Sequence, residues 1–208
     1  MPESHTIVVR DAVVHVTSSR TVRGDVVTTD GMLSRVGPAQ RPDPPGALVL
    51  DAPGASVVPL LVDGAIRARG DDARDRDELA PGRPAIFAVI RGAVRASRIG
   101  EMLMVDPRDM LAVVLEDRLV AWDGAVADSD DPGPAWTGAW TDGRRGMTQF
   151  LTAHGRYSET RGGRADAYTG RFWAHRDRIA YLDDTGFWAF GEQVDGILHH
   201  GGFVLRRA

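Results

Sequence analysis

The chain has 208 residues, no cysteine, no lysine and a formal charge of −4. This acidic balance argues against nucleic acid as a partner, because proteins that bind nucleic acid need a basic face. The missing cysteine excludes disulfides and sulfur-ligated metals, and the missing lysine excludes Schiff-base catalysis through a lysine amine. No apolar run approaches the roughly 20 residues of a membrane span, and the N-terminus has no signal-peptide pattern. We therefore expect a cytoplasmic globular protein of one or two domains, with no membrane partner.

Short β-rich runs divided by turn signals fill the first sixty residues. The runs are rich in valine and isoleucine, and an Asp-Gly dipeptide at residues 30–31 predicts a hairpin turn. No window shows the 3.6-residue apolar period of an amphipathic helix. The pattern predicts an all-β, sandwich-like unit. Its expected strands are Thr6–Arg10, Ala12–Thr17, Asp25–Thr29, Met32–Val36, Ala47–Asp51 and Ser56–Pro59.

The segments VVRDAVVH, GDVVTTDGMLSRVGPA and VLDAPGASVVPLLVDGAIR together resemble the start of the metal-dependent amidohydrolase superfamily. Those enzymes begin with a small β-sandwich and enter a TIM barrel through a Pro-Gly-Leu-Val-Asp-x-His-x-His run that binds the metal. Ala65 and Arg67 stand at the two histidine positions here, and neither side chain can ligate a metal. The resemblance therefore implies a sandwich without metal-dependent hydrolysis.

The catalytic barrel of that superfamily is also missing from the sequence. A charge run from Gly70 to Glu78 is followed directly by LAPGRPAIFAVIRG, which resembles the return from the barrel to the sandwich. Met104–Val105 and Met110–Asp123 then supply the closing strands. We expect residues 1–125 to form this degenerate sandwich and residues 126–135, which are acidic and rich in proline and glycine, to form a linker. Any homodimer is expected to form through the sandwich.

Nearly all aromatic residues lie in the remaining segment, residues 136–208, together with four of the six histidines. Aromatic bodies with polar tips are typical of small-molecule sites, although they also fill the core of a small β-domain. Evenly spaced short runs with polar turns predict an up-and-down antiparallel barrel, because closure removes exposed strand edges. The expected strands are 136–141, 147–152, 155–160, 166–174, 178–183, 186–192, 195–199 and 202–207.

Five motifs stand out in this segment: Trp140-Thr141-x-Gly143, Gly155-Arg156-Tyr157-x-Glu159-x-Arg161-Gly162, Ala167-Tyr168-x-Gly170-Arg171, Asp183-Asp184-Thr185-Gly186-Phe187 and His200-Gly201-Gly202. Together they resemble a small bacterial family first described from an Agrobacterium protein of unassigned function, a lipocalin-like and streptavidin-like barrel. The resemblance implies ligand binding and supplies no reaction. Gly138-Ala139-Trp140 also resembles the Gly-x-Trp of lipocalins, whose Trp plugs one end beneath an Arg of the last strand, here Arg206 or Arg207.

Strand alternation places polar and aromatic side chains together on the inner face of this barrel. Tyr157, Glu159 and Arg161 share one face of a strand, and Tyr181 shares a face with Asp183. Such a set predicts a lumen that orients a polar ligand or performs acid–base chemistry. The alternative is an internal ion-pair network that braces the strands. The predicted catalytic residues are Tyr157, Glu159, Asp183, His199 and His200, and the predicted ligand-binding residues are Trp136, Arg161, Tyr168, Arg171, Trp173, Tyr181 and Trp188.

One histidine of the adjacent pair His199-His200 must face the lumen, where a neighbouring carboxylate would make it a candidate general base. The sequence does not say which one. Two histidines alone make no metal site, because neighbours on a strand point in opposite directions. The run Asp183-Asp184-Thr185-Gly186 is first of all a turn, since Asp caps such turns and Gly takes the positive φ.

Two functional classes fit these features. The first is a cofactor-free enzyme that acts on a small hydrophobic or aromatic molecule, a cyclase, isomerase or lyase of specialised natural-product metabolism. A small barrel can catalyse such a step by shaping a flexible substrate and placing one acid or base. The second is a non-catalytic binding or carrier module, with the sandwich as a platform on which a partner docks.

Overall fold

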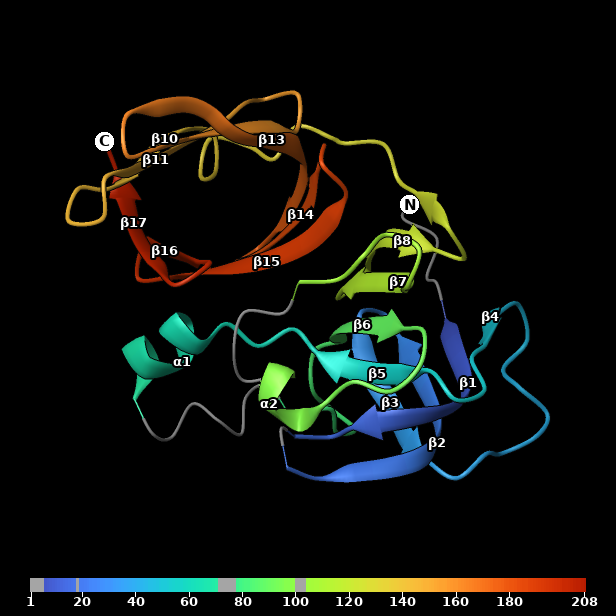
Figure 1. Ribbon diagram of the computed structural model, residues 1–208. Helices are drawn as coiled ribbons and strands as arrows, with labels where there is room; N and C mark the ends of the chain where they lie inside the picture. Colours follow the sequence, from blue (N-terminus) through green and yellow to red (C-terminus); the bar gives the residue numbers. More distant parts are fainter. Residues whose placement is uncertain (1–5, 18, 71–77, 100–103) are drawn as a thin grey trace. The chain divides into compact units, whose positions relative to one another are not determined.

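The computed structural model describes residues 6–17, 19–70, 78–99 and 104–208 (Figure 1). Its described residues form two compact units, each taken by itself below. The first contains residues up to 61, 78–99 and 108–127, and the second contains 62–70, 104–107 and 128–208. Both units are built mainly of strands, which confirms the predicted all-β class, with two short helices that the sequence pattern did not predict. Most of the charge run at 70–78 lies outside the described residues. No helix in the described part is long and apolar enough to cross a membrane.

The first unit is a nine-stranded sheet with the order β3-β2-β1-β5-β6-β7-β8-β9, in which β4 also pairs with β1. Both β4 and β5 run parallel to β1, and the other neighbouring pairs are antiparallel. The elements are β1 (Ile7–His15), β2 (Thr21–Thr29), β3 (Met32–Gly37), β4 (Leu48–Asp51), β5 (Ser56–Pro59), β6 (Ile86–Ile90), α2 (Ala96–Ile99), β7 (Met110–Leu115), β8 (Arg118–Trp122) and β9 (Ala125–Val126).

Strand β1 joins two of the predicted strands into one. The pairing with β2 shifts register between Val9 and Ala12, and Asp11 in this bulge has a φ of 51°. A bulge absorbs an extra residue and bends the strand without ending it. The first part of β1 pairs with β4 and the second part pairs with β5. One bent strand therefore organises the sheet where the sequence predicted a break.

The core of this unit is a single apolar cluster. Fully buried residues from five strands contribute to it, among them Val9, Val26, Val57, Phe87 and Val114. All five side chains point to the same face of the sheet, as expected for strands in which alternate residues face opposite sides. Because all of these strands deliver side chains to one cluster, the sheet curves around a common core.

The second unit is built on a closed antiparallel barrel in which each strand pairs with the next in sequence and β17 pairs with β10. This confirms the predicted up-and-down barrel, and the predicted strand ends fall within a residue or two of the observed ones. The strands are β10 (Gly138–Asp142), β11 (Met147–Leu151), β12 (Arg156–Arg161), β13 (Arg164–His175), β14 (Arg178–Asp183), β15 (Phe187–Val194), β16 (Ile197–His200) and β17 (Phe203–Arg207).

The closure between the first and last strands is short. Two residue pairs, Trp140↔Arg207 and Thr141↔Arg206, form it, and the backbone N–H of Ala208 donates to the carbonyl of Ala139 at 3.0 Å. Beyond them, the Asp142 carboxylate accepts the backbone N–H of Val204 at 3.1 Å. A side chain thus replaces the backbone ladder where β10 and β17 separate. We call this region the seam.

The predicted contact between the barrel tryptophan and an arginine of the last strand is present at the seam. The guanidinium of Arg207 lies 5.1 Å from the centre of the Trp140 ring. Arg206 faces the opposite side of β17, so the partner is Arg207. Trp140 is almost fully buried, and its indole N–H donates to the carbonyl of Trp136 at 2.8 Å. This arrangement supports the structural role that the sequence predicts for Trp140.

The barrel interior has an apolar end and a polar end. The apolar end lies toward the turns that follow β11, β13 and β15, and it contains Leu151, Ile179 and Leu198. The polar end lies toward the turns that follow β10, β12, β14 and β16, and the charged lumen residues gather there. This polarity along the barrel axis positions the candidate site.

Two upstream segments belong to the barrel unit and cover part of its outer wall. Helix α1 (Asp63–Arg69) packs against β15 and β16, where a Cβ added to Gly64 would lie 3.0 Å from Nδ1 of His199. Val105 forms an isolated bridge with Trp188, and the two residues exchange backbone hydrogen bonds of 3.2 and 2.7 Å. The range predicted for the sandwich, 1–125, therefore includes segments that pack with the barrel.

Candidate functional site

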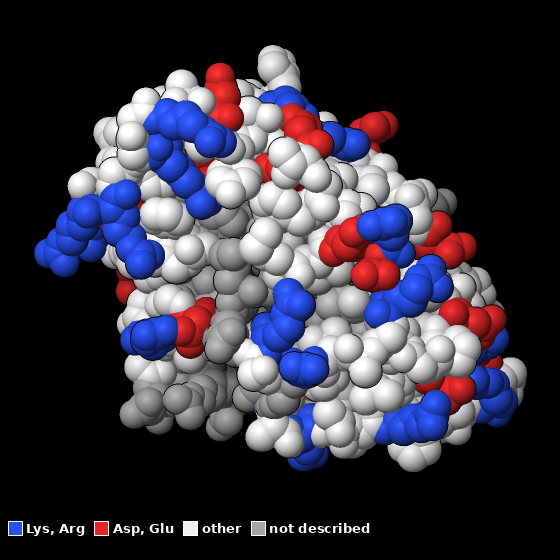
Figure 2. All heavy atoms as spheres, in the orientation of Figure 1, with Lys and Arg blue, Asp and Glu red and all other residues white. Residues whose placement is uncertain are grey.

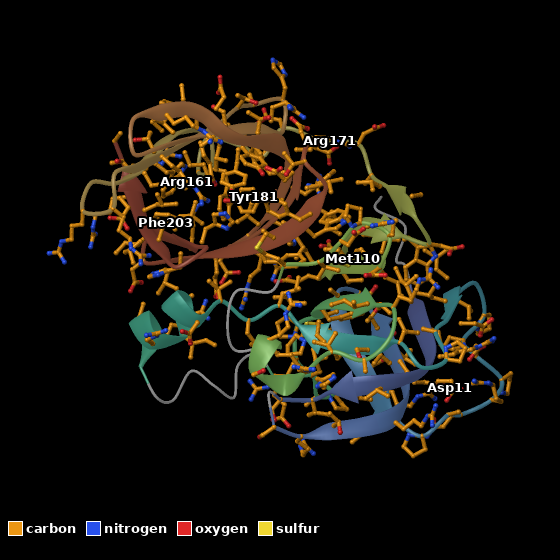
Figure 3. The ribbon with its side chains drawn as sticks, viewed as in Figure 1. Asp11, Met110, Arg161, Arg171, Tyr181 and Phe203 are labelled. Carbon is orange, nitrogen blue, oxygen red and sulfur yellow. The ribbon has the colours of Figure 1, made fainter. Side chains whose placement is uncertain are left out.

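The alternation predicted for β12 and β14 holds in the structure. Tyr157, Glu159, Tyr181 and Asp183 all face the barrel interior, and each is at most 4% exposed. Figure 3 shows Tyr181 inside the barrel, with Arg161 nearer its end. The structure thus brings together the core of the predicted site on two strands that are not neighbours. It arranges these side chains in two hydrogen-bonded groups.

The first group is centred on the Glu159 carboxylate, which is 1% exposed. The amide of Gln149 donates to its Oε1 at 2.9 Å, and Nε of Arg161 donates to its Oε2 at 2.8 Å. The Nε2 atom of His200 lies 3.5 Å from Oε1. Burial by itself raises the pKa of a carboxyl group. Hydrogen bonds and electrostatic attraction from His200 and Arg161 outweigh burial here and hold the pKa of Glu159 below its ordinary value.

His200 is the histidine of the adjacent pair that faces the lumen. Its ring lies over Tyr181 with a centroid separation of 4.3 Å, and its Nδ1 lies 3.1 Å from the carbonyl oxygen of Phe190. Both ring nitrogens therefore face hydrogen-bond acceptors, one on the backbone and one on Glu159. His199 points to the outer wall, so the structure does not bring it into the predicted site. Burial and the charges of Arg69 and Arg206 lower the pKa of His199.

The second group is centred on Asp183, at the end of β14. The hydroxyl of Tyr157 donates to its Oδ2 at 2.7 Å, and the backbone N–H of Thr185 donates to its Oδ1 at 2.8 Å. Burial, and then the bond to Asp183, raise the pKa of Tyr157, which keeps the phenol a neutral donor. The bond to Thr185 caps the turn that the sequence predicts. Asp184 points outward and pairs with Arg156 at 2.5 Å.

Arg161 connects the Glu159 group to the surface at the polar end. Its guanidinium lies 4.4 Å from the ring centre of Tyr168 and 4.9 Å from that of Phe203. Its side chain is 36% exposed, whereas Glu159 is buried. Arg161 is therefore a fixed cation with aromatic walls that a molecule in solution can reach. Phe203 was absent from the predicted site, although it begins the strand after the predicted motif His200-Gly201-Gly202.

Gln149 is the interior residue that the sequence prediction missed. It is fully buried and connects one aromatic and one acidic side chain. Its Oε1 accepts a hydrogen bond from the hydroxyl of Tyr181 at 2.9 Å, and its amide N–H donates to Glu159. A signal for it existed, since Gln149 lies between the inward-facing Met147 and Leu151. Burial raises the pKa of Tyr181, so its phenol also stays a donor.

Several predicted ligand-binding residues lie away from the polar end. Trp173 and Trp188 are 1% exposed on the outer wall, where their rings stack at 5.6 Å and 29°. The indole N–H of Trp173 donates to the carbonyl of Asp128 at 3.2 Å, and Arg171 covers the same ring at 4.8 Å. Trp136 lies in the apolar core cluster of the barrel. Their surroundings give these residues packing roles, because covering segments occupy the faces that a ligand would need.

Comparison with known proteins gives the family of the barrel. Residues 134–207, which include all eight barrel strands, match the model of a family described as Agrobacterium tumefaciens protein Atu4866. The solution structure of the protein Atu4866 from Agrobacterium tumefaciens is 42% identical in sequence, with a TM-score of 0.32, over 35% of this chain and 92% of that chain. No curated protein matches the sequence. The barrel segment, residues 134–207, therefore matches the family described as Agrobacterium tumefaciens protein Atu4866.

Proposed function

We propose that the barrel binds a small aromatic molecule carrying an acidic group at its polar end, with Arg161 as the principal contact. The observation that carries this proposal is that the guanidinium of Arg161 uses only part of its hydrogen-bonding capacity. Glu159 accepts from its Nε and Nη2 atoms, while its Nη1 atom has no partner among the described residues. An oriented guanidinium with an open N–H edge is suited to a carboxylate or a similar anion.

The aromatic part of the ligand follows from the walls of this position. Tyr168 and Phe203 flank Arg161, and the Phe187 ring meets that of Tyr168 edge to face at 5.9 Å. Aromatic side chains supply contact area at a low entropic cost, and a planar ligand group packs well against them. A network around Glu159 that only braced neighbouring strands would gain little from such walls.

A fluorescence titration with 8-anilinonaphthalene-1-sulfonate, an aromatic anion, tests the proposal. Arg161→Gln should weaken its binding at least about tenfold, because a charge-assisted hydrogen bond contributes roughly 1.5–3 kcal/mol. Arg83→Gln removes the same charge from an exposed position in the sheet unit and should leave the affinity unchanged. Equal affinity for wild type and Arg161→Gln, with both variants folded, would remove the proposed contact.

Acid–base catalysis at His200 is a second candidate, and it corresponds to a cofactor-free cyclase, isomerase or lyase. The observation that favours it is the distance of 3.5 Å between Nε2 of His200 and Oε1 of Glu159, with the Tyr181 ring against the imidazole. An imidazole held by a carboxylate is a common arrangement for proton transfer. Under this reading, His200→Asn abolishes turnover of a substrate but preserves binding at Arg161. If His200→Asn retains full turnover of an identified substrate, only the binding role survives.

For the first unit we propose a non-catalytic platform derived from an amidohydrolase sandwich. The two family histidine positions come just after β5, in helix α1 of the second unit, where Ala65 is fully buried and Arg67 pairs with Asp63 on the same helix. Ala65 offers no ligand atom, and Arg67 is already committed to an acid. Elemental analysis of the purified protein is the test. About one equivalent of bound zinc would contradict this reading of the unit.

A further inference from the structure

A cleft of about 640 Å³ lies outside the lumen, beside the seam at the polar end of the barrel. Thr141 and Val204, which face the outer wall, contribute to its lining. The cleft has a structural origin, because the β10–β17 ladder stops after two residue pairs and the strands then separate around Asp142. Its volume is in the range of cavities that hold small metabolites.

Three arginines line this cleft: Arg144, Arg145 and Arg206. Figure 2 shows basic side chains gathered at the left of the view, over the turn that joins β10 and β11. The carboxylate of Asp142 is the acidic group in the lining, but it is 7% exposed and accepts the backbone N–H groups of Arg145 and Val204. With three guanidiniums against this one carboxylate, the lining of the cleft keeps a net positive charge.

The three guanidiniums differ in how firmly they are held. Arg145 donates to the carbonyl of Gly202 at 2.5 Å and lies 5.2 Å from the ring centre of Phe203, so it is oriented before any ligand arrives. The side chains of Arg144 and Arg206 form neither an ion pair nor a hydrogen bond with any of the residues that the structure describes. One fixed and two uncommitted cations around a single cleft are suited to a ligand with more than one negative oxygen group.

We propose that the seam cleft binds a small oxyanion-bearing molecule, a phosphate compound or a polycarboxylate, through Arg144, Arg145 and Arg206. This site is distinct from the proposed lumen site, because Arg161 lies inside the barrel end and Arg206 lies on the outer wall, with the Phe203 ring between Arg161 and Arg145. Glycines at 143 and 202 leave the backbone of both flanking turns open to close approach. Planar guanidiniums bind phosphate and carboxylate in the same bidentate way, so the chemistry of the site is shared by both ligand types.

Isothermal titration calorimetry with pyrophosphate and with citrate tests the site and distinguishes the two ligand types. Titrations at low and at about 0.15 M ionic strength show whether binding survives screening. Arg144→Gln and Arg206→Gln should each weaken binding of the preferred probe about tenfold or more. Arg164→Gln, the matched control with the same change of net charge, should bind as wild type does. Thermal unfolding of each variant shows that it is folded, which exposed Arg→Gln changes should permit.

Two results would overturn the proposal. One is the absence of heat from either probe at millimolar concentration with folded wild-type protein. The other is equal weakening by Arg164→Gln and by the two cleft variants, which would mean diffuse attraction to a basic surface. Neither result bears on the lumen, because Arg161→Gln and 8-anilinonaphthalene-1-sulfonate test that site with a different residue and a different probe.

Discussion

The carboxylate of Glu159 and the guanidinium of Arg161 meet on one face of β12, where Nη2 lies 2.6 Å from Oε2 although the carboxylate is buried and the guanidinium is partly exposed. Residues two apart on a strand share a face, so this contact is set by the local sequence. The pair therefore connects the buried hydrogen-bond network around Glu159 to a solvent-exposed cation at the polar end. It also allows the functional and bracing interpretations of the network to be separated.

Replacing Glu159 with Gln keeps the shape and the hydrogen bond to Gln149 but removes the charge. We expect the free energy of unfolding to fall by less than about 1 kcal/mol, because Arg161 is exposed enough for water to solvate it. The affinity for 8-anilinonaphthalene-1-sulfonate should fall about tenfold, or about 1.4 kcal/mol, because Arg161 loses its orienting partner. Urea unfolding and fluorescence titration measure the two effects. A large loss of stability with unchanged affinity would favour the bracing interpretation.

His199 should make the barrel unit less stable as the pH falls below 6.5. Its pKa in the folded state lies below the ordinary value of 6.5, so the unfolded chain binds more protons in this window. The stability contribution is therefore complete above pH 6.5 and is lost as the pH falls toward the folded pKa. His199→Gln should flatten the pH dependence of urea unfolding in that window, whereas the exposed His154→Gln should keep it. An unchanged slope in His199→Gln would contradict this account.

Gly170→Ala should strongly destabilise the barrel. An added Cβ would lie 2.3 Å from the carbonyl oxygen of Leu182 and 2.7 Å from Cε1 of Tyr157. Because the backbone of a paired strand can move only at a large energetic cost, we expect the free energy of unfolding, measured by chemical denaturation, to fall by about 3 kcal/mol or more. Gly143→Ala is the control, because its Cβ would meet no atom within 4 Å. Similar stabilities of the two variants would show that the strands can relax.

Arg207→Ala should weaken the seam. It removes the cation over the Trp140 ring and the hydrogen bond to the carbonyl of Pro134, at 2.5 Å. We expect a loss of about 1 kcal/mol, which is typical of an exposed cation–π contact. Arg206→Ala changes the same charge on the other face of the strand and should cost less. Urea denaturation followed by tryptophan fluorescence compares the two.

A fragment of residues 131–208 contains every barrel strand and should unfold cooperatively. It lacks α1, residues 104–107 and Asp128, which cover the outer wall around Trp173 and Trp188. We therefore expect a lower melting temperature than in the full chain. The tryptophan emission should shift to the red, because these two indole rings become exposed to solvent. Fluorescence and thermal scans of both proteins measure this. The absence of any cooperative transition would show that the covering segments are required for the barrel to fold.

Local patterns predicted the barrel well because its turns and its alternation are local. The turn residues marked the eight strands, and a period of two placed Tyr157, Glu159 and Tyr181 inside. The same pattern could not decide between His199 and His200, because alternation separates two faces without saying which one is inside. It also could not foresee that Trp188 is covered, since its partner Val105 lies far away in the sequence and pairs with it only in the folded unit. Gln149 was missed because a polar residue between apolar ones gives no sign of its partners.

The closure of the barrel by its final strand sets an order on synthesis. The sheet unit is complete at Ala127, whereas β17 ends at Arg207, 80 residues later. At roughly 5–20 residues per second, the ribosome needs about 4–16 s to cover that distance. The sheet can therefore fold first, whereas α1 and residues 104–107 remain uncovered until the barrel strands that bury them have been synthesised. These waiting segments are where a chaperone would be expected to bind the nascent chain.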